Sequence, residues 1–183
     1  MNKIHLSELL RSGILFMLTA CQALGQPLTN VMSRPGDTID GMNLTTGVEN
    51  AVPLWAFCLP TVENDHLISA DCPELSYRKL AIGHTFGVMD LLPQSVDWSE
   101  LIWELYLDGH PIDLNAFGIH DFVLPDLTAS HFPIREVFRK ITVWDVVLVN
   151  PTPRAHTLRG IVQTEAETYT WIVSFTIKMP PGN

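Results

Sequence analysis

The sequence predicts an all-β protein, folded as an antiparallel sandwich of about seven to nine short strands. All 13 prolines lie after residue 26, and their spacing leaves little room for long helices, because proline removes an amide donor and clashes inside a helix. Short runs rich in Val, Ile, Thr and aromatic residues alternate with Pro, Gly, Asn and Asp. That composition is typical of strands between turns.

The expected strands share this composition and are bounded by turn residues. In the last of them the odd-numbered positions from Tyr169 to Phe175 are all large and apolar or aromatic, whereas the even-numbered positions are mostly polar. We therefore expect the odd-numbered side to face the core. The expected strands are 54–58, 77–86, 101–107, 121–124, 143–149, 156–162 and 168–178.

Two local features refine this prediction. Asp108-Gly109 lies between apolar runs and predicts a β-hairpin, because glycine tolerates positive φ and Asp bonds its own backbone. Helical spacing of apolar residues and a capping pair, Asp97 with Glu100, predict at most a short helix near 97–103, followed by strand.

The C-terminal part resembles a known class of domain. "NPTPRAHTLRGIV" (150–162) followed by "TYTWIVSFTI" (168–177) resembles the closing strands of immunoglobulin-like domains in bacterial surface proteins. Those domains commonly have a Pro-Gly turn before His-Thr-Leu, and here Arg154-Ala155 stands at the position of that glycine. The resemblance implies an immunoglobulin-like sandwich.

The first 20 residues have the layout of an export signal. Lys3 and Arg11 precede the uncharged run 14–20, an order typical of such signals, and this run is shorter than the roughly 20 residues of a membrane-spanning helix. It ends in Leu18-Thr19-Ala20-Cys21, which resembles the lipobox of bacterial lipoproteins. The resemblance implies that Cys21 is lipidated and becomes the N-terminus of an envelope protein.

Two alternatives remain open for this region. The triplet 23–25, Ala-Leu-Gly, offers an ordinary cleavage site before Gln26, which would give a secreted protein. Alternatively, Leu6, Leu9 and Leu10 lie on one side of an amphipathic helix that packs on a cytosolic domain.

The predicted organisation is a signal peptide at 1–20, a flexible tether at 21–37 and one β-sandwich domain at 38–183. The tether is expected because 22–37 is polar, contains Pro and Gly, and lacks strand or helix periodicity. One domain is the default for 183 residues with 46% hydrophobic residues.

The three cysteines fit an exported protein. Assigning Cys21 to a lipid leaves Cys58 and Cys72 as a natural disulfide pair, which would close a loop of about 15 residues and contribute about 3 kcal/mol. The alternative is two buried free thiols in a cytosolic protein.

The charge of the chain excludes one class of partner. Eleven Lys and Arg against twenty Asp and Glu give a formal net charge of -9, which repels phosphate backbones. We expect no nucleic-acid partner, contact with a membrane through the lipid anchor, and a glycan or protein ligand on the loops.

Asp97, Glu100 and Glu104 form the densest acidic cluster, beside Trp98 and Trp103. Paired carboxylates hydrolyse glycosidic bonds when one stays protonated in an apolar pocket, and tryptophan rings stack on sugars. The alternative is a helix cap beside a solvated face, with the tryptophans in the core.

His110, His120 and His131 with Asp113 and Asp121 are the best candidates for a metal site, since they share one loop-rich region. Simple solvation of these loop residues is the alternative. Asp-rich loops could hold Ca²⁺, but they lack EF-hand spacing, so no cofactor is expected.

No nucleophile elbow, P-loop, dinucleotide fingerprint, HExxH or CxxC is present in the sequence. The leading hypothesis is therefore an exported, lipid-anchored, non-catalytic binding or structural module. The alternatives are a secreted hydrolase acting on glycans and a cytosolic β-domain.

Overall fold

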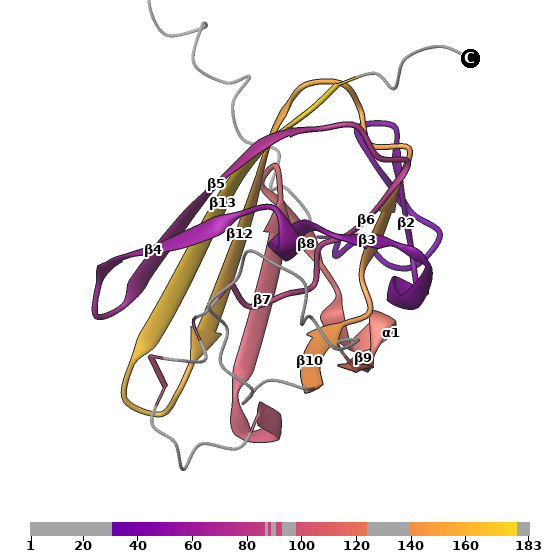
Figure 1. The fold of residues 1–183 in the computed structure, drawn as a ribbon. Helices are drawn as coiled ribbons and strands as arrows, with labels where there is room; N and C mark the ends of the chain where they lie inside the picture. The colour runs from indigo at the N-terminus through magenta and orange to yellow at the C-terminus, as the bar shows by residue number, and fades with distance from the viewer. Residues whose placement is uncertain (1–30, 87, 89–90, 93–97, 124–139, 179–183) are drawn as a thin grey trace, which may run out of the picture. The chain divides into compact units, whose positions relative to one another are not determined.

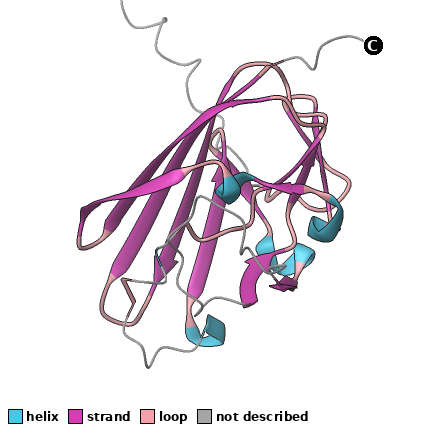
Figure 2. Cartoon of the chain, viewed as in Figure 1, coloured by secondary structure: helices cyan, strands magenta, loops and turns pink. Residues whose placement is uncertain are grey.

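Two β-sheets and a separate two-stranded ribbon make up the described part of the chain (Figures 1 and 2). The computed structural model describes residues 31–86, 88, 91–92, 98–123 and 140–178. The all-β prediction is confirmed. The elements are β1 (Thr38–Ile39), β2 (Met42–Thr45), η1 (Val48–Asn50), β3 (Val52–Pro53), η2 (Leu54–Ala56), β4 (Leu59–Asn64), β5 (Leu67–Leu75), β6 (Lys79–Ala81), η4 (Trp98–Glu100), β7 (Ile102–Leu107), β8 (His110–Ile112), α1 (Leu114–Phe117), β9 (Ile119–Val123), β10 (Lys140–Trp144), β11 (Val147–Val149), β12 (Ala155–Gln163) and β13 (Thr168–Ile177), where η denotes a 3-10 turn.

The larger sheet has the strand order β4-β5-β13-β12-β7-β8, and its long strands lie side by side in Figure 1. β12 and β13 form an antiparallel pair from Ala155 opposite Thr176 to Gln163 opposite Thr168. The predicted alternation on β13 is confirmed, because the four odd-numbered side chains from Tyr169 to Phe175 are at most 4% exposed.

The smaller sheet has the order β1-β2-β11-β6-β3. Its inward side chains, such as Leu44 and Leu148, belong to the same buried cluster as Leu105, Leu158 and Trp171 of the larger sheet. The two sheets therefore pack on one common core, and the described residues from Val31 onward belong to one compact unit.

The prediction of purely antiparallel sheets is wrong at two places. β5 runs parallel to β13, and β3 runs parallel to β6. Hairpin signals in a sequence report only on strands joined by a short turn, whereas β5 and β13 are about a hundred residues apart. Their direction is therefore set by packing that the local pattern does not encode.

Several strand boundaries also differ from the prediction. Residues 54–56 form the 3-10 turn η2 rather than a strand, and the run 77–86 is strand only at Lys79–Ala81. The run 143–149 is interrupted at Asp145, whose Oδ1 accepts hydrogen bonds of 2.8 Å from the amides of both Gly47 and Val48. These hydrogen bonds connect Asp145 to the start of η1, and the expected strand is interrupted there.

The hairpin and the short helical turn are confirmed. Asp108 and Gly109 have φ values of 50° and 84°, and Leu107 pairs with His110 across the turn. Trp98–Glu100 is a single 3-10 turn, and β7 begins at Ile102.

The sulfur atoms of Cys58 and Cys72 lie at bonding distance, and their Cα atoms are 4.4 Å apart. This pair continues the β4–β5 register, since Leu59 lies opposite Asp71. The bridge therefore closes the base of this hairpin. β4 and β5 are both absent from the predicted strands. All six residues of β4 are exposed, so its sequence shows no alternation of apolar and polar residues.

Part of the segment expected to be a tether contacts the domain. Ser33 forms a parallel bridge with Ile112, and Arg34 pairs with Asp113 at 3.0 Å. Across the described residues, no helix is both long and apolar enough to span a bilayer.

Candidate functional site

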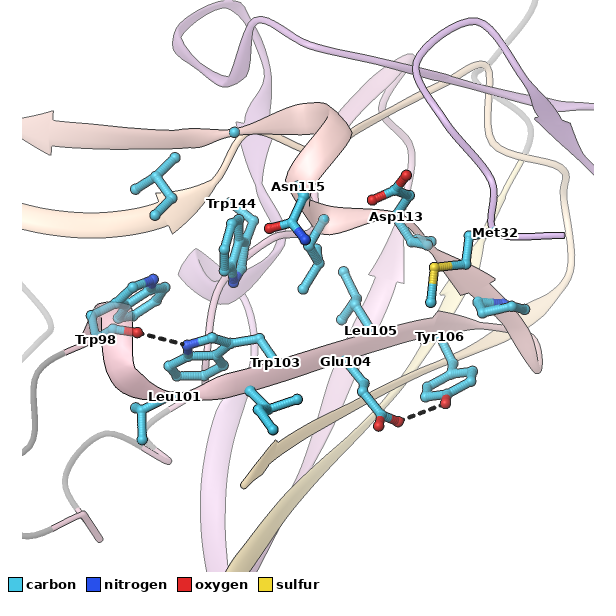
Figure 3. Close-up of a pocket in the computed structure, with 16 residues that line it drawn as sticks. Met32, Trp98, Leu101, Trp103, Glu104, Leu105, Tyr106, Asp113, Asn115 and Trp144 are labelled. Atoms are coloured by element: carbon cyan, nitrogen blue, oxygen red, sulfur yellow. Dashed lines mark hydrogen bonds between the residues drawn. The ribbon is translucent and has the colours of Figure 1, made fainter. Parts of the chain in front are cut away.

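A pocket of about 620 Å³ lies where η4, β7, β8, α1, β9 and the end of β10 meet. Figure 3 shows Trp98, Trp103 and Trp144 converging on it from η4, β7 and β10. The rest of its inner wall is mostly aliphatic, for example Leu105 and Ile112. Volume and composition are those of a small-ligand or peptide side-chain site.

Gly83 fixes the position of Trp144. The amide of Trp144 donates to the carbonyl of Gly83 at 3.0 Å, and a Cβ at residue 83 would overlap the carbonyl oxygen of Trp144. Only glycine permits this close approach of two backbones.

The rings of these tryptophans largely contact one another. The rings of Trp98 and Trp103 stack at 4.3 Å between centroids, and Trp103 meets Trp171 edge-on at 6.1 Å. Trp98 also lies 5.9 Å from Trp144 in a tilted contact. This packing builds a rigid aromatic wall but occupies the ring surfaces on which a sugar would stack.

Two indole N–H groups at the pocket have no hydrogen-bond partner among the described residues, those of Trp98 and Trp144. Trp144 is 8% exposed, and in Figure 3 its nitrogen edge faces β7 across the pocket. By contrast, Trp103 Nε1 donates to the carbonyl of Trp98 at 3.2 Å. An unpaired buried donor costs about 1–3 kcal/mol. Among the described residues, the core residue Trp171 has the same unpartnered N–H without lining the pocket.

The acidic cluster of the sequence is divided by the strand that carries it. Trp103 and Leu105 extend to one side of β7, and Glu104 and Tyr106 extend to the other (Figure 3), because neighbouring residues of a strand face opposite sides. Glu104 and Tyr106 also contribute to the pocket lining. Glu100 is exposed on η4, and Asp97 lies outside the described residues.

Glu104 is held as a hydrogen-bond acceptor. Its Oε2 accepts from the Tyr106 hydroxyl at 2.6 Å, and Oε1 accepts from Gln163 Nε2 at 3.4 Å. The bond to Glu104 is the main cause of the raised pKa of Tyr106, to which partial burial adds. A general acid must donate a proton, whereas Glu104 accepts hydrogen bonds from both of these donors.

The candidate metal ligands are dispersed. His110 is exposed on β8, Asp113 pairs with Arg34, and Asp121 on β9 accepts from Thr142 at 2.8 Å. His120 also lies on β9, and His131 lies outside the described residues. In the part of the chain that the structure describes, no group of three or more His, Cys, Asp or Glu residues is placed to hold a metal ion.

Sequence reasoning missed a buried polar network beside the β7–β8 turn. His156 is 2% exposed, and its Nδ1 and Nε2 lie 2.8 Å from Asp108 Oδ2 and from the carbonyl oxygen of Thr152. Asp108 also accepts from the amide of Thr157 and from Arg154, both at 2.8 Å. The only signal in the sequence was a histidine on the core side of an alternating strand.

This network is structural in its chemistry. The Thr152 hydroxyl is 3.4 Å from His156 Nε2, but the backbone oxygen of the same residue lies closer and the ring is buried. The histidine therefore connects β12 to the β7–β8 turn through its hydrogen bond with Asp108.

No family model matches this chain. Searches of curated proteins and of solved structures found no match either.

Proposed function

We propose that this protein is an exported, non-catalytic binding module whose ligand occupies the pocket beside Trp98, Trp103 and Trp144. The observation that carries this proposal is the pair of unpartnered indole N–H groups at a preformed pocket. A rigid wall with unused donors favours the binding of a ligand that supplies acceptors.

Binding is favoured over glycan hydrolysis by the placement of the acids. Hydrolysis needs two carboxyl groups on either side of one scissile bond, one of them protonated. Two of the described carboxylates line the pocket, and each already has partners: Glu104 accepts from Tyr106 and Gln163, and Asp113 pairs with Arg34. Glu100 is exposed and lies outside the pocket lining.

The proposed site of action is the bacterial cell envelope. The Leu18–Cys21 lipobox supports lipidation of Cys21 and attachment to a membrane. The Cys58–Cys72 pair is consistent with an oxidising compartment, in which disulfides persist.

We also propose that the domain is immunoglobulin-like. The order β13-β12-β7-β8 in the larger sheet parallels the G-F-C-C′ order of variable-type immunoglobulin domains. The residues that first suggested this resemblance form β12 and β13, which supports the same assignment.

The binding proposal is tested by titrating the full-length protein with four probes of different chemistry, using calorimetry. The probes are a peptide that favours an extended conformation, a neutral tetrasaccharide, choline and dodecanoate. We expect saturable binding of at least one probe, weakened in Trp144→Phe and unchanged in Trp55→Phe, which makes the same substitution outside the pocket. Binding of none, or turnover of the bound probe, would overturn the proposal.

The export proposal is tested by intact-mass analysis of protein from the membrane fraction of a bacterial host. We expect a chain that starts at Cys21 and carries a lipid-sized gain in mass, and a loss of membrane attachment in Cys21→Ala. A soluble full-length chain with Cys58 and Cys72 reduced would support a cytosolic protein instead.

A further inference from the structure

Among the described residues, no strand pairs with this edge of β7 before Leu105, at the pocket. β8 pairs with β7 only from Leu105 to Leu107 and ends at Ile112. Leu107 and His110 flank a two-residue turn, so they exchange both backbone bonds, and Leu105 with Ile112 form the next such pair. By the same alternation, the N–H and C=O of Trp103 point to the edge of β7 that pairs with β8 at Leu105. At Trp103, no described strand pairs with this edge.

The segment at Ser33 does not fill this gap. Its amide donates to the carbonyl of Pro111, and the amide of Asp113 donates to its carbonyl. It therefore pairs with the outer edge of β8, while the edge at Trp103 faces the pocket.

Apolar side chains surround this open edge. Ile102 is 62% exposed, and Ile119 and Met32 are each 50% exposed, and all three line the pocket. Exposed large apolar residues gathered at one site indicate a surface that is covered by a partner.

Glu100 and Glu104 leave an acidic excess around the edge, although Arg34 pairs with Asp113 and Arg159 lies over the Tyr106 ring. Glu100 on η4 and Glu104 on β7 are acidic, and the chain carries a formal net charge of -9. Such an edge attracts basic side chains and repels acidic ones.

We propose that the ligand is an extended peptide with an apolar centre and Lys or Arg on its flanks, which adds a strand to β7 at Trp103. This inference rests on the proposed binding function and names its ligand class. The peptide backbone pairs with the N–H and C=O of Trp103, and a peptide carbonyl accepts from the indole N–H of Trp144. An apolar peptide side chain enters the pocket beside Leu105 and Ile112.

A peptide satisfies this site better than the other ligand chemistries. Dodecanoate offers no donor to the carbonyl of Trp103, and choline has a single hydroxyl, which cannot pair with both the Trp103 backbone and the Trp144 indole. A saccharide offers hydroxyl groups, but one face of Trp103 is already covered by the stacked ring of Trp98. Strand addition uses the backbone edge for affinity and the pocket for specificity.

The experiment compares three versions of one peptide, acetyl-Lys-Thr-Val-Phe-Val-Thr-Lys-amide, binding to the full-length protein. N-methylation removes amide donors from one edge of a strand at a time, because successive amides point to opposite edges. We expect the unmodified peptide to bind, methylation on one edge to abolish binding, and methylation on the other edge to leave it within about twofold.

Protein variants locate the site. Trp144→Phe is expected to weaken peptide binding about tenfold, as for the loss of one hydrogen bond, and Trp55→Phe is the matched control. If Trp144→Phe fails to fold, Ile102→Lys replaces it, since this exposed residue has little role in stability and its added charge opposes the basic peptide.

The outcomes separate the two proposals. Equal binding of both methylated peptides, or binding of the tetrasaccharide, choline or dodecanoate without the peptide, overturns the peptide inference and leaves the binding function standing. Failure of all four probes overturns both.

Discussion

At the scale of single residues, the packing of the Trp171 ring requires glycine at position 160. Gly160 lies opposite Trp171 in the β12–β13 pair, and a Cβ at residue 160 would overlap the indole ring. Trp171 is 2% exposed, so its ring has no space into which to move.

We therefore expect Gly160→Ala to lower the free energy of unfolding by about 1–3 kcal/mol, the usual cost of overpacking a core. Urea unfolding followed by tryptophan fluorescence measures this change. Ser174→Ala, on the exposed side of β13, is the control and should change stability little. Equal effects of the two substitutions would contradict the packing described here.

We expect His84 to make the free energy of unfolding depend on pH. Its Nδ1 accepts from the amide of Phe86 at 2.8 Å and its ring stacks on Trp55. Burial lowers the pKa of His84 from 6.5 to about 4, so between these values the unfolded chain binds a proton that the folded protein does not. The free energy of unfolding should therefore fall as the pH falls from 6.5 to 4, by about 3 kcal/mol in total.

Denaturant unfolding at several pH values measures this slope. His84→Gln cannot titrate and should flatten the curve over this range, whereas His110→Gln, at an exposed position, should retain it. An unchanged slope in His84→Gln would show that another group is responsible.

Residues with local partners were predictable, and those with distant partners were not. The Cys58–Cys72 pair followed from the cysteine count and from a spacing of 14. His156 and Asp108 are 48 residues apart, and nothing near either one in the sequence indicates that they meet.

At the scale of elements, β13 and the β7–β8 hairpin were predictable because their signals are local. The first depends on alternation and the second on a turn that needs positive φ. β4 was missed because both of its faces are exposed, and the β5–β13 pairing was missed because parallel strands leave no turn signal between them.

The disulfide should stabilise the β4–β5 hairpin. β4 has no buried residues and pairs on one side with β5, so little packing holds it in place. The double variant Cys58→Ser, Cys72→Ser should lose about 3 kcal/mol of unfolding free energy, as expected for a loop of about 15 residues.

Reductant provides the control for this prediction. It should lower the Tm of the native protein but leave the double variant unchanged, and amide exchange in β4 should rise before that in β12. Native protein that is insensitive to reductant would mean that the bridge contributes little.

At the scale of the whole molecule, the sequence predicted an all-β domain and part of the pocket. Trp98, Trp103 and Glu104 are neighbours in sequence, so they could be named together, but alternation along β7 places Glu104 on the other side of the strand. Trp144 comes from β10, about 40 residues away, and is positioned by its pairing with Ile119 on β9 and by the packing of its backbone on Gly83.

The indole region of a ¹H–¹⁵N spectrum tests the binding site most directly, because the chain has five tryptophans and each contributes one N–H signal. Titration of the full-length protein with the four probes should move the Trp144 signal for at least one probe, and leave those of Trp55 and Trp171 in place. A probe that binds while the Trp144 signal stays fixed would contradict the assignment of this pocket as the ligand site.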